Sequence, residues 1–543
     1  MISAVHSRSH LVRLAVLAVL LASAVATASA PSPAHFGPVD AITVAGLRRH
    51  LQFIASDALE GRDTLSPGFR AAAEYIAASL DRIGAVPAGD NHTFFQHVGI
   101  RRTSVDADRA SLTVGETEFK YGEDYLVPTP GDASGALAFV GQGYRVTARH
   151  LDPFAGIDVK DRVLVITQPP PDLGNLTRGT DYTTPADNAR ALGASAVVSI
   201  VSYQRLAAWT RLREMEERGK LEIDRLPEND ESRPYILAGP RLASALLRGE
   251  KLDATKITTH AAAGEVDPSF AFKTGKAVRI HTTGSTRVED TENVVAIIEG
   301  SDPMLRHEYV ALGAHLDHLG RESQHAARTG APAVPGKDDI YNGADDDGSG
   351  VVALLQMAEA AAAGPRPKRS LLFVWHTGEE YGSWGAKYFT AFPTVPLDRV
   401  VAQLNVDMIG RSRPIGDDTP EDQVLSGPNE VYIVGSRRLS QDLGDTCDRV
   451  DRAFLNLALN YKYDAPDDPE RIYERSDHYE YAQKGIPVAF FFTGLHGDYH
   501  RVTDEVDRID FDKLRKVAQT VLATAWTLAD APDRPRLDHA ATR

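Results

Sequence analysis

The chain contains 543 residues, 43% of them hydrophobic and 25% charged, and carries a formal net charge of −16. This composition is typical of a globular protein long enough for two or three domains. Nucleic acid is excluded as a partner, because binding its phosphates needs a basic face that so acidic a chain is not expected to present. Cys447 is the single cysteine, so no internal disulfide can form, and we expect its side chain to be a buried apolar filler.

The first thirty residues have the pattern of a signal peptide. Arg8 and Arg13 precede the apolar run LAVLAVLLASAVA, and the segment ends on the small-x-small cleavage pattern Ala28-Ser29-Ala30. We therefore expect residues 1–30 to be removed and the protein to be secreted or periplasmic, with an uncleaved anchor as the alternative. No later stretch reaches about 18 apolar residues, so no membrane span is expected after removal of the signal. The sequence does not indicate the oligomeric state.

Residues 31–103 open with helical patterns. Apolar residues recur at helical spacing over 41–57 and over 66–84. Ser66 directly before Pro67 is a favourable start for the second helix, because serine caps a helix and proline suits its first position. We therefore expect the chain after residue 30 to open with two helices.

The rest of the chain falls into two long blocks and a short tail. Residues 104–282 consist mainly of short β-like runs separated by Pro, Gly and Asp, which predicts a self-contained β-rich module. Residues 283–530 alternate apolar strand-like runs with helical segments, the pattern of a buried sheet covered by helices on both faces. The fold class is therefore α/β. Residues 531–543 are expected to form a disordered tail.

Polar side chains suited to metal binding follow the strand-like runs of the last block. In sheets of this kind, functional residues gather in loops at the carboxyl ends of the strands. His315 and Asp317 close the run EYVALGAHLDH, and their two-residue spacing would let the carboxylate orient the imidazole. Each residue alone is more often structural, but imidazole and carboxylate groups recurring at successive strand ends favour zinc. The other candidates are Glu379, Glu380, Asp407, His496, Tyr499 and His500.

Three other catalytic or metal-binding patterns fail in this sequence. HEYVA at 307–311 lacks the second histidine of HExxH. A calcium loop over 343–354 fails because Gly343 and Leu354 stand where acidic ligands are required. No serine lies in a Gly-x-Ser-x-Gly elbow, so a hydrolase with a nucleophilic serine is not expected.

Five motifs together resemble a known family. GAHLDH, NGADDDGSG, GEE, NVDMIG and DYHRVTD resemble, in order and spacing, those of secreted zinc aminopeptidases related to glutamate carboxypeptidase and the transferrin receptor. The resemblance covers residues 41–103 and 283–528, and the block between them resembles the protease-associated domain that many members carry. It implies a three-layer α/β/α sandwich with a mixed, mostly parallel central sheet.

The resemblance also implies two zinc ions per chain. His315 and Asp407 would hold one zinc, Glu380 and His500 would hold the other, and Asp346 would bridge both. Three ligand carboxylates against the four positive charges of two zinc ions would explain why so many acids lie together.

Three further roles follow from the resemblance. Glu379 would be the general base that takes a proton from a water activated by the two zinc ions, and passes it to the leaving amine. Asp317 would orient His315, and Tyr499 would help to stabilise the oxyanion.

The aspartate triplet in NGADDDGSG departs from the family pattern. The residue after the bridging aspartate is usually Asn in the family, and this chain has Asp347 there. The register of the following Gly-Ser-Gly favours Asp346 as the bridge. We expect Asp345 and Asp347 to be flanking residues, solvated or hydrogen-bonded, rather than ligands.

The sequence thus predicts an exported zinc-dependent aminopeptidase acting on peptides or proteins with free N-termini. A dipeptidase or carboxypeptidase of the same fold, a glutaminyl cyclase and a non-catalytic receptor-like binding protein are the alternatives. The preference for the N-terminal residue stays open. Residues 474–487 align with a loop near the substrate pocket, yet Ser476, Asp477 and His478 equally fit a helix cap and surface residues.

Overall fold

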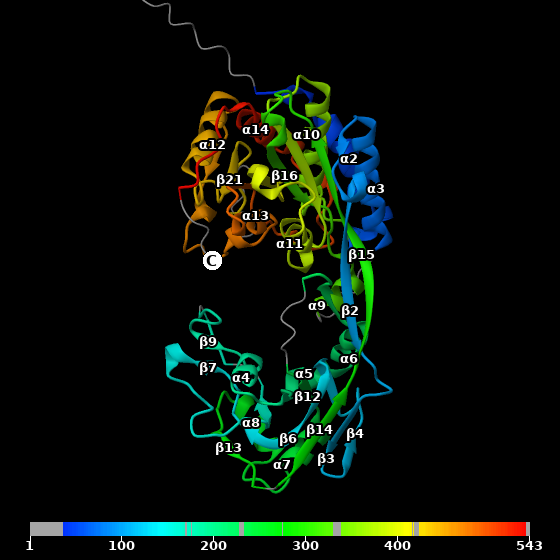
Figure 1. Ribbon diagram of the computed structural model, residues 1–543, viewed down its shortest axis with the longest axis vertical. Coiled ribbons are helices and arrows are strands. Elements are labelled where there is room, and N and C mark those ends of the chain that lie inside the picture. Colours follow the sequence, from blue (N-terminus) through cyan, green and yellow to red (C-terminus); the bar gives the residue numbers. More distant parts are fainter. Residues whose placement is uncertain are drawn as a thin grey trace, which may run out of the picture.

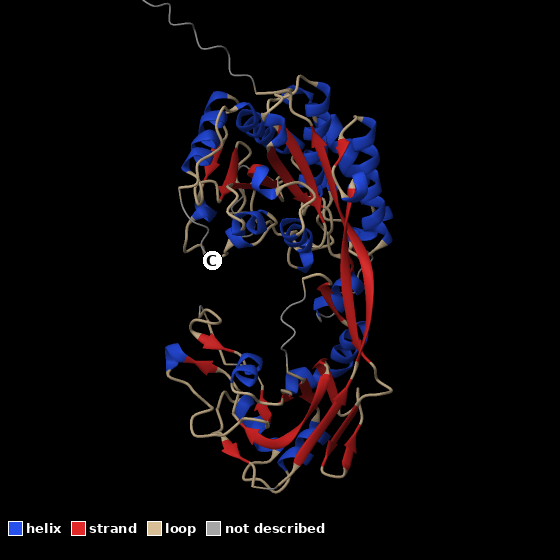
Figure 2. Cartoon of the chain, in the orientation of Figure 1, coloured by secondary structure: helices blue, strands red, loops and turns tan. Residues whose placement is uncertain are grey.

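The computed structural model describes residues 36–168, 171–174, 176–226, 233–273, 275–329, 338–414, 416 and 423–538. Figure 1 shows two parts that follow one another along the long axis, each built on a sheet of its own. Two long strands, β2 (Phe95–Val105) and β15 (Gly284–Ile298), pair antiparallel and run from one part into the other (Figure 2).

The upper part in Figure 1 is built on a ten-stranded sheet. Its four central strands lie in the order β19, β16, β20, β23 and are parallel, whereas β15 joins β19, and β21 joins β23, antiparallel. The sheet is mixed, as predicted, but parallel pairing is confined to its centre and to the β21–β22 pair. The remaining strands of this sheet are β1 (Val86–Pro87), β11 (Lys220–Ile223), β16 (Tyr309–His315), β19 (Ser370–His376), β20 (Val400–Val406), β21 (Glu430–Val434), β22 (Ala458–Asn460) and β23 (Val488–Phe492).

Helices cover both faces of this sheet. Phe373 and Trp375 of β19 belong to one apolar cluster together with α2, α3, α10, α12 and α14, whereas Leu372 and Val374 pack with α11 and α13. Successive side chains of a strand point to opposite faces, so the two clusters are the two interfaces of a three-layer α/β/α sandwich. The helices are α2 (Val44–Ile54), α3 (Pro67–Arg82), α10 (Gly348–Ala363), α11 (Trp384–Ala391), α12 (Gln441–Ala453), α13 (His478–Gln483) and α14 (Phe511–Asp530).

The lower part is built on a nine-stranded sheet whose strands all fall between residues 104 and 282. Helices also lie in this block, and β11 leaves it to pair with β2 in the first sheet. Its boundaries and its identity as a protease-associated domain stay predictions. The strands of its sheet are β3 (Ser111–Val114), β4 (Thr117–Phe119), β5 (Tyr125–Thr129), β6 (Gly131–Phe139), β8 (Val163–Thr167), β10 (Ala196–Ile200), β12 (Tyr235–Ala238), β13 (Phe270–Ala271) and β14 (Ala277–Thr282). The helices are α4 (Pro185–Ala191), α5 (Tyr203–Ala207), α6 (Trp209–Arg218), α7 (Pro240–Leu247) and α8 (Ala254–Ala262).

Two small strand pairs and one helix complete the described strands and α-helices. β7 (Arg145–Val146) pairs with β9 (Tyr182–Thr183) in the lower part. β17 (Gly320–Arg321) pairs with β18 (Ile340–Tyr341), and α9 (Glu322–Thr329) follows β17 in the chain.

The start of the predicted disordered tail lies against the upper part. Arg534 pairs with Glu308 at 2.7 Å and Arg536 with Asp442 at 2.8 Å, so residues 531–538 are held by ion pairs with acids that are distant in sequence. The predicted signal peptide over 1–30 lies outside the described residues. Among the described helices, none is long and apolar enough to cross a membrane.

Candidate metal centre and active site

The predicted ligands gather at one edge of the central sheet. His315 ends β16, the Glu379–Glu380 pair follows β19, and Asp407 follows β20. Because these strands are parallel, their carboxyl ends meet at the same edge. Asp346 lies in the loop before α10, and His500 lies in the loop after β23.

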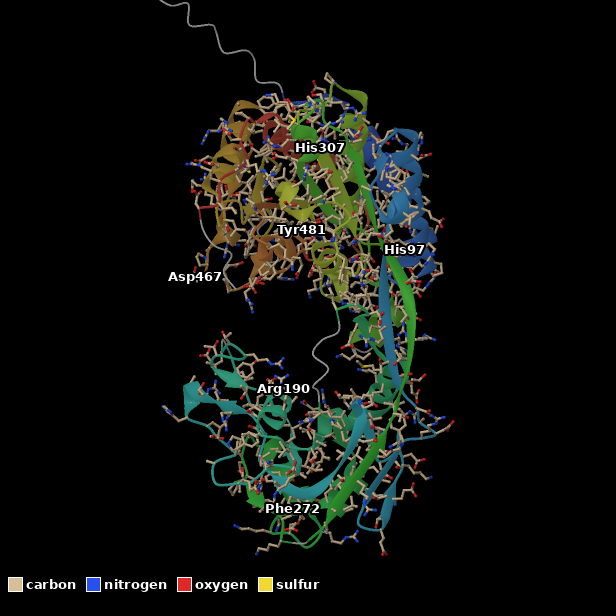
Figure 3. The ribbon with its side chains drawn as sticks, viewed as in Figure 1. His97, Arg190, Phe272, His307, Asp467 and Tyr481 are labelled. Atoms are coloured by element: carbon tan, nitrogen blue, oxygen red, sulfur yellow. The ribbon has the colours of Figure 1, made fainter. Side chains whose placement is uncertain are left out.

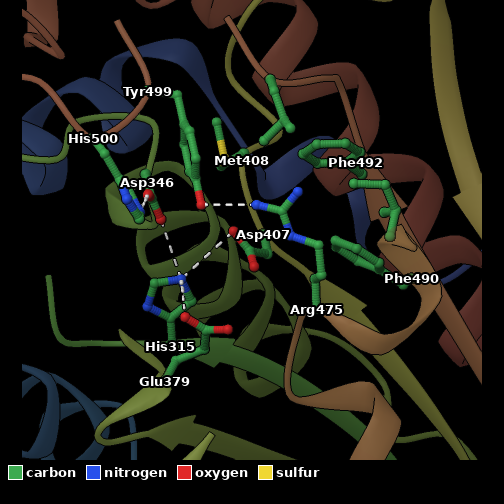
Figure 4. A pocket seen from close by; sticks show the side chains of 12 residues that line it. His315, Asp346, Glu379, Asp407, Met408, Arg475, Phe490, Phe492, Tyr499 and His500 are labelled. Carbon is green, nitrogen blue, oxygen red and sulfur yellow. Dashed lines mark hydrogen bonds and ion pairs between the residues drawn. The ribbon is translucent and has the colours of Figure 1, made fainter. Parts of the chain in front are cut away.

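A first group of possible metal donors forms around His315. Its Nε2 lies 3.3 Å from Asp346 Oδ1, 3.6 Å from Asp407 Oδ1 and 4.0 Å from Glu379 Oε2 (Figure 4). The ring of His315 is buried, and His315, Asp346 and Asp407 together satisfy the spacing of a metal site. We refer to these three residues as the His315 cluster.

A second group forms around Glu380. Glu380 Oε1 lies 3.3 Å from His500 Nε2, and that nitrogen lies 3.1 Å from Asp346 Oδ2. His318 joins them, with its Nδ1 2.9 Å from Glu380 Oε1 and 3.7 Å from Asp346 Oδ2. We refer to Asp346, Glu380, His500 and His318 as the Glu380 cluster. Asp346 turns one carboxylate oxygen toward each cluster, as the predicted bridge requires.

His318 is absent from the residues singled out in the sequence. Side-chain alternation along β16 puts His315 and Asp317 on one side and His318 on the other. The strand ends at His315, however, and residues 316–319 lie outside any strand, so alternation no longer decides where the later side chains point. The sequence HLDH contains both histidines, but only the path of the chain after the strand brings the second one to the cluster.

Asp317 contacts its neighbours differently from the prediction. His315 Nδ1 lies 3.1 Å from the main-chain oxygen of Asp317, whereas the Asp317 carboxylate is 3.9 Å from that nitrogen. The carboxylate instead accepts hydrogen bonds from the backbone N–H groups of Glu379 at 3.0 Å and Glu380 at 3.3 Å, and from the hydroxyl of Thr64 at 2.9 Å. Asp317 therefore orients His315 through its carbonyl and fixes the turn of the two glutamates through its carboxylate.

Glu379 and Tyr499 lie beside the clusters. Glu379 belongs to neither donor group, and burial raises the pKa of its carboxyl well above the usual range. The ring of Tyr499 stacks on His500 with 3.9 Å between ring centroids, and its hydroxyl accepts a hydrogen bond from Arg475 at 3.2 Å. The pocket that contains Glu379 and Tyr499, drawn in Figure 4, is also lined by the apolar side chains of Met408, Ile472, Phe490, Phe492 and Leu495.

The flanking aspartates are buried and hydrogen-bonded rather than solvated. Asp345 Oδ1 accepts a hydrogen bond from the backbone N–H of Gly410 at 2.6 Å, and its Oδ2 lies 3.3 Å from His496 Nε2. Asp347 accepts from the backbone N–H groups of His315 at 3.1 Å and Met408 at 3.2 Å. His496, a candidate ligand in the sequence, thus contacts Asp345 and stands outside both clusters.

Residues 474–487 contribute buried support for Asp407. Ser476 donates a hydrogen bond to Asp407 Oδ2 at 2.7 Å, and Asp477 Oδ2 lies 3.3 Å from His376 Nδ1. The second nitrogen of His376 shares a hydrogen bond of 3.0 Å with the hydroxyl of Tyr481, whose side chain lies inside the upper part (Figure 3). The surface interpretation of this segment is therefore wrong for Ser476, Asp477 and His478, all of which are buried.

The chemistry of the two clusters suits divalent cations. His318 Nδ1, Asp346 Oδ2 and Glu380 Oε1 are buried and have no hydrogen-bond partner. Burial alone would raise the pKa of Asp346, but the neighbouring histidines His318, His315 and His500 hold it well below the usual range. Buried polar atoms normally have partners, and imidazole nitrogens with carboxylate oxygens are the donors that zinc prefers. The residues present therefore fit two zinc ions that share Asp346.

Comparisons with known proteins agree with this chemistry. Residues 293–525, which include both clusters, match the model of Peptidase family M28. A probable leucine aminopeptidase of Trichophyton verrucosum (strain HKI 0517) is 27% identical over 248 residues, covering 44% of this chain and 58% of the relative. A probable zinc metalloprotease of Pyrenophora teres f. teres (strain 0-1) is 27% identical over 226 residues, covering 36% of this chain and 45% of the relative. The chain thus spans about half the length of the curated relatives it matches.

A solved structure shares the fold. The aminopeptidase from Aneurinibacillus sp. strain AM-1 superposes with a TM-score of 0.50 over 93% of this chain and 98% of its own, at 17% sequence identity. At that identity the likeness concerns the fold. Residues 293–525 thus resemble the zinc metallopeptidases of family M28, and probable aminopeptidases are among the relatives of the chain.

Proposed function

We propose that the protein is an exported aminopeptidase that uses two zinc ions to release N-terminal residues from peptides. The observation that carries this proposal is Asp346, whose two carboxylate oxygens face two separate donor clusters while the unligated carboxyl of Glu379 lies 4.0 Å from His315 Nε2. Export rests on the signal pattern over residues 1–30 alone.

The donors divide between two metal positions. His315 and Asp407 would hold one zinc, Glu380 and His500 would hold the other, and Asp346 would contact both. When bound, the two ions would supply Lewis acidity that polarises the scissile carbonyl and lowers the pKa of the attacking water. Three buried carboxylates balance most of their charge.

Glu379 performs the proton transfers. Its carboxylate takes a proton from the attacking water and then passes it to the nitrogen of the leaving amine. Burial raises the pKa of Glu379 well above the usual range, the direction in which a carboxylate becomes a stronger base. The Asp317 carboxylate holds the backbone N–H of Glu379 at 3.0 Å and so keeps the base in place.

Tyr499 and the apolar side chains of the pocket act on the substrate. Arg475 donates to the Tyr499 oxygen, which leaves the phenolic O–H free to donate to the oxyanion that develops on the scissile carbonyl. The apolar side chains of Met408, Phe490 and Phe492 line the same pocket. They favour an apolar N-terminal residue such as leucine, because each buried CH₂ group contributes about 0.8 kcal/mol.

A matched pair of peptides tests the proposal. Leu-Ala-Phe peptides with a free or an acetylated N-terminus are incubated with the purified protein, with and without a chelator, and the products are identified by mass spectrometry. We expect release of leucine from the free peptide only, with loss of this activity on chelation and its return with zinc. Release of the C-terminal residue from the acetylated peptide would indicate a carboxypeptidase and reject the amino-end proposal. No cleavage by a protein with two bound zinc ions would reject peptidase function.

A further inference from the structure

We propose that His318 is a fourth protein ligand in the Glu380 cluster, which makes the two metal positions unequal. The inference rests on the proposed function, since it requires two zinc ions. The Glu380 cluster then offers four protein donors, Asp346, Glu380, His500 and His318, whereas the His315 cluster offers three.

The distances within the Glu380 cluster suit donors around one ion. Two donors bound at about 2.0–2.1 Å with tetrahedral angles lie about 3.3 Å apart. His318 Nδ1 lies 2.9 Å from Glu380 Oε1 and 3.7 Å from Asp346 Oδ2, and His500 Nε2 lies 3.3 Å and 3.1 Å from the same two oxygens. The two histidines thus approach the same pair of oxygens at similar distances. Their rings meet edge to face, with 5.9 Å between centroids.

Hydrogen bonding does not account for the position of His318. Its ring is fully buried, and neither ring nitrogen has a hydrogen-bond partner. The 2.9 Å contact between His318 Nδ1 and Glu380 Oε1 lacks hydrogen-bond geometry, since both atoms remain without partners. Unpartnered buried polar atoms at this spacing are what a shared cation would satisfy. His318 Nε2 lacks a partner whether or not Nδ1 binds zinc, so this atom does not distinguish a ligand from a structural residue.

The surrounding backbone fixes the His318 ring in place. The backbone N–H of His318 donates to the carbonyl of Arg62 at 3.1 Å. Gly343, with a φ of +55°, lies against the ring, and a Cβ at this position would come 2.4 Å from His318 Cδ2. The ring can therefore not swing away from the cluster on that side.

Unequal ligand sets have a functional consequence. Zinc sites enclosed by four protein donors are typically structural, whereas catalytic sites keep three protein ligands and an open position for water or substrate. We therefore infer that the Glu380 position loads first and holds zinc more tightly. The His315 position, with Glu379 beside it, keeps the open coordination site where the substrate carbonyl binds.

Zinc titrations of the metal-free protein test this inference. Wild type, His318→Ala and His318→Gln are titrated with zinc against a chromophoric chelator, and each titration is repeated in an Asp407→Ala background that retains only the Glu380 position. We expect two zinc equivalents in wild type, and a loss of affinity at the Glu380 position of at least about 10- to 100-fold in both His318 variants. Affinity at the His315 position should change less than about threefold.

A matched control and an independent measurement keep the test decisive. His496→Ala removes another buried histidine, one that contacts Asp345 instead of Asp346, and should leave the affinity of both zinc equivalents within about threefold of wild type. Cobalt(II) added to wild type at one equivalent should give the intense visible absorption of a four-coordinate site. This measurement uses wild type alone, so it does not depend on whether a variant folds.

Three outcomes would overturn the inference. These are unchanged zinc affinity in both His318 variants, equal weakening of both equivalents, or a weak cobalt spectrum at the first equivalent. A wild type that binds no second zinc would instead reject the two-zinc function itself.

Discussion

The carboxylate of Asp347 accepts a hydrogen bond from the backbone N–H of His315, with its Oδ2 3.1 Å from that nitrogen. Its Oδ1 accepts from the backbone N–H groups of Gly350 at 3.0 Å and Met408 at 3.2 Å. Asp347 therefore ties the start of α10 to the ends of the two strands that carry His315 and Asp407. The residue in the position where the resembled family usually has Asn thus faces protein rather than water.

We expect Asp347→Asn to weaken zinc binding by at least about tenfold. Burial and then the charge of Asp407 raise the pKa of Asp347 well above the usual range, so its ionised form is costly unless cations are near. The amide has no charge to offer the metals, and one charge a few ångströms away is worth more than about 1.4 kcal/mol. Because both Asp347 oxygens accept backbone N–H groups, the NH₂ group of Asn would leave at least one of these donors unpaired, and the zinc-free variant should unfold at a lower temperature than wild type. Unchanged zinc affinity, measured by chelator competition, would contradict this role for the charge.

Glu379→Gln should lower kcat by about 10²- to 10⁴-fold, the usual contribution of a general base. Because Glu379 lies outside both donor clusters, the variant should still bind two zinc ions per chain. The measurements are turnover of a leucyl anilide and zinc content by atomic emission. Glu380→Gln is the matched neighbour, for which we expect zinc loss together with activity loss. A Glu379→Gln enzyme with more than about a tenth of wild-type kcat would exclude this residue as the base.

Arg62→Met should lower the free energy of unfolding by about 3 kcal/mol or more, because it leaves several buried carbonyls without donors. The Arg62 guanidinium is fully buried and donates to the carbonyls of Ile54, Leu316, Asn342 and Gly343 at 2.6–3.1 Å. It therefore joins the loop after β16 to the loop before α10.

Denaturant unfolding of the zinc-free protein measures this effect without the contribution of the metals. The matched control is Arg70→Met, since the Arg70 side chain is 57% exposed and lies 3.9 Å from Glu292. Its effect should be below about 1 kcal/mol, as for exposed ion pairs. Equal effects of the two substitutions on the free energy of unfolding would show that the buried hydrogen bonds of Arg62 stabilise the fold no more than the exposed ion pair of Arg70 does.

Glu216, which lies on α6 in the lower part of the molecule, should make the free energy of unfolding depend on pH. Burial raises the pKa of Glu216 to about 7, above the value of about 4.3 for an unfolded chain. Between these two pH values the folded state therefore binds more protons than the unfolded state. The contribution of Glu216 to the free energy of unfolding is full below about pH 4 and is lost as the pH rises through 7, by at most about 1.4 kcal/mol per pH unit.

Glu216→Gln should flatten this dependence. The hydrogen bonds from the Val127 N–H and the Tyr121 hydroxyl both end on Glu216 Oε2, which an amide oxygen can replace. Thermal unfolding of zinc-free protein between pH 5 and 8 compares the variant with wild type and with Glu217→Gln, whose exposed side chain pairs with Arg213. The same pH slope in all three proteins would refute the assignment.

Local signals predicted the elements that carry the site. Ser66 accepts a hydrogen bond from the Phe69 N–H at 3.1 Å and caps α3, as expected from serine before proline. The apolar runs before His315 and Asp407 are strands of a buried sheet, because side chains buried on both faces leave an uninterrupted hydrophobic pattern. The family resemblance added which of the polar residues at the strand ends would share a metal.

Long-range packing decided what local patterns could not. β11 pairs with β2, and β2 and β15 are the two long strands that extend from the upper part into the lower part. Nothing in the short run at 220–223 indicates this pairing. The 531–538 segment is held by Glu308 and Asp442, which are distant in sequence. The sequence leaves open whether Asp345 and Asp347 are solvated or hydrogen-bonded. Backbone N–H groups of other segments, those of His315, Met408 and Gly410, donate hydrogen bonds to them.

By itself, the sequence determined the fold class, the order of the motifs and the residue types at each strand end, since these follow from periodicity and spacing within short segments. The tertiary structure alone decided that Asp317 holds His315 through a carbonyl, that Asp347 is buried, and that His318 joins Glu380. These contacts join loops that follow different strands. Their distances depend on where each chain segment turns after its strand, which no single segment encodes.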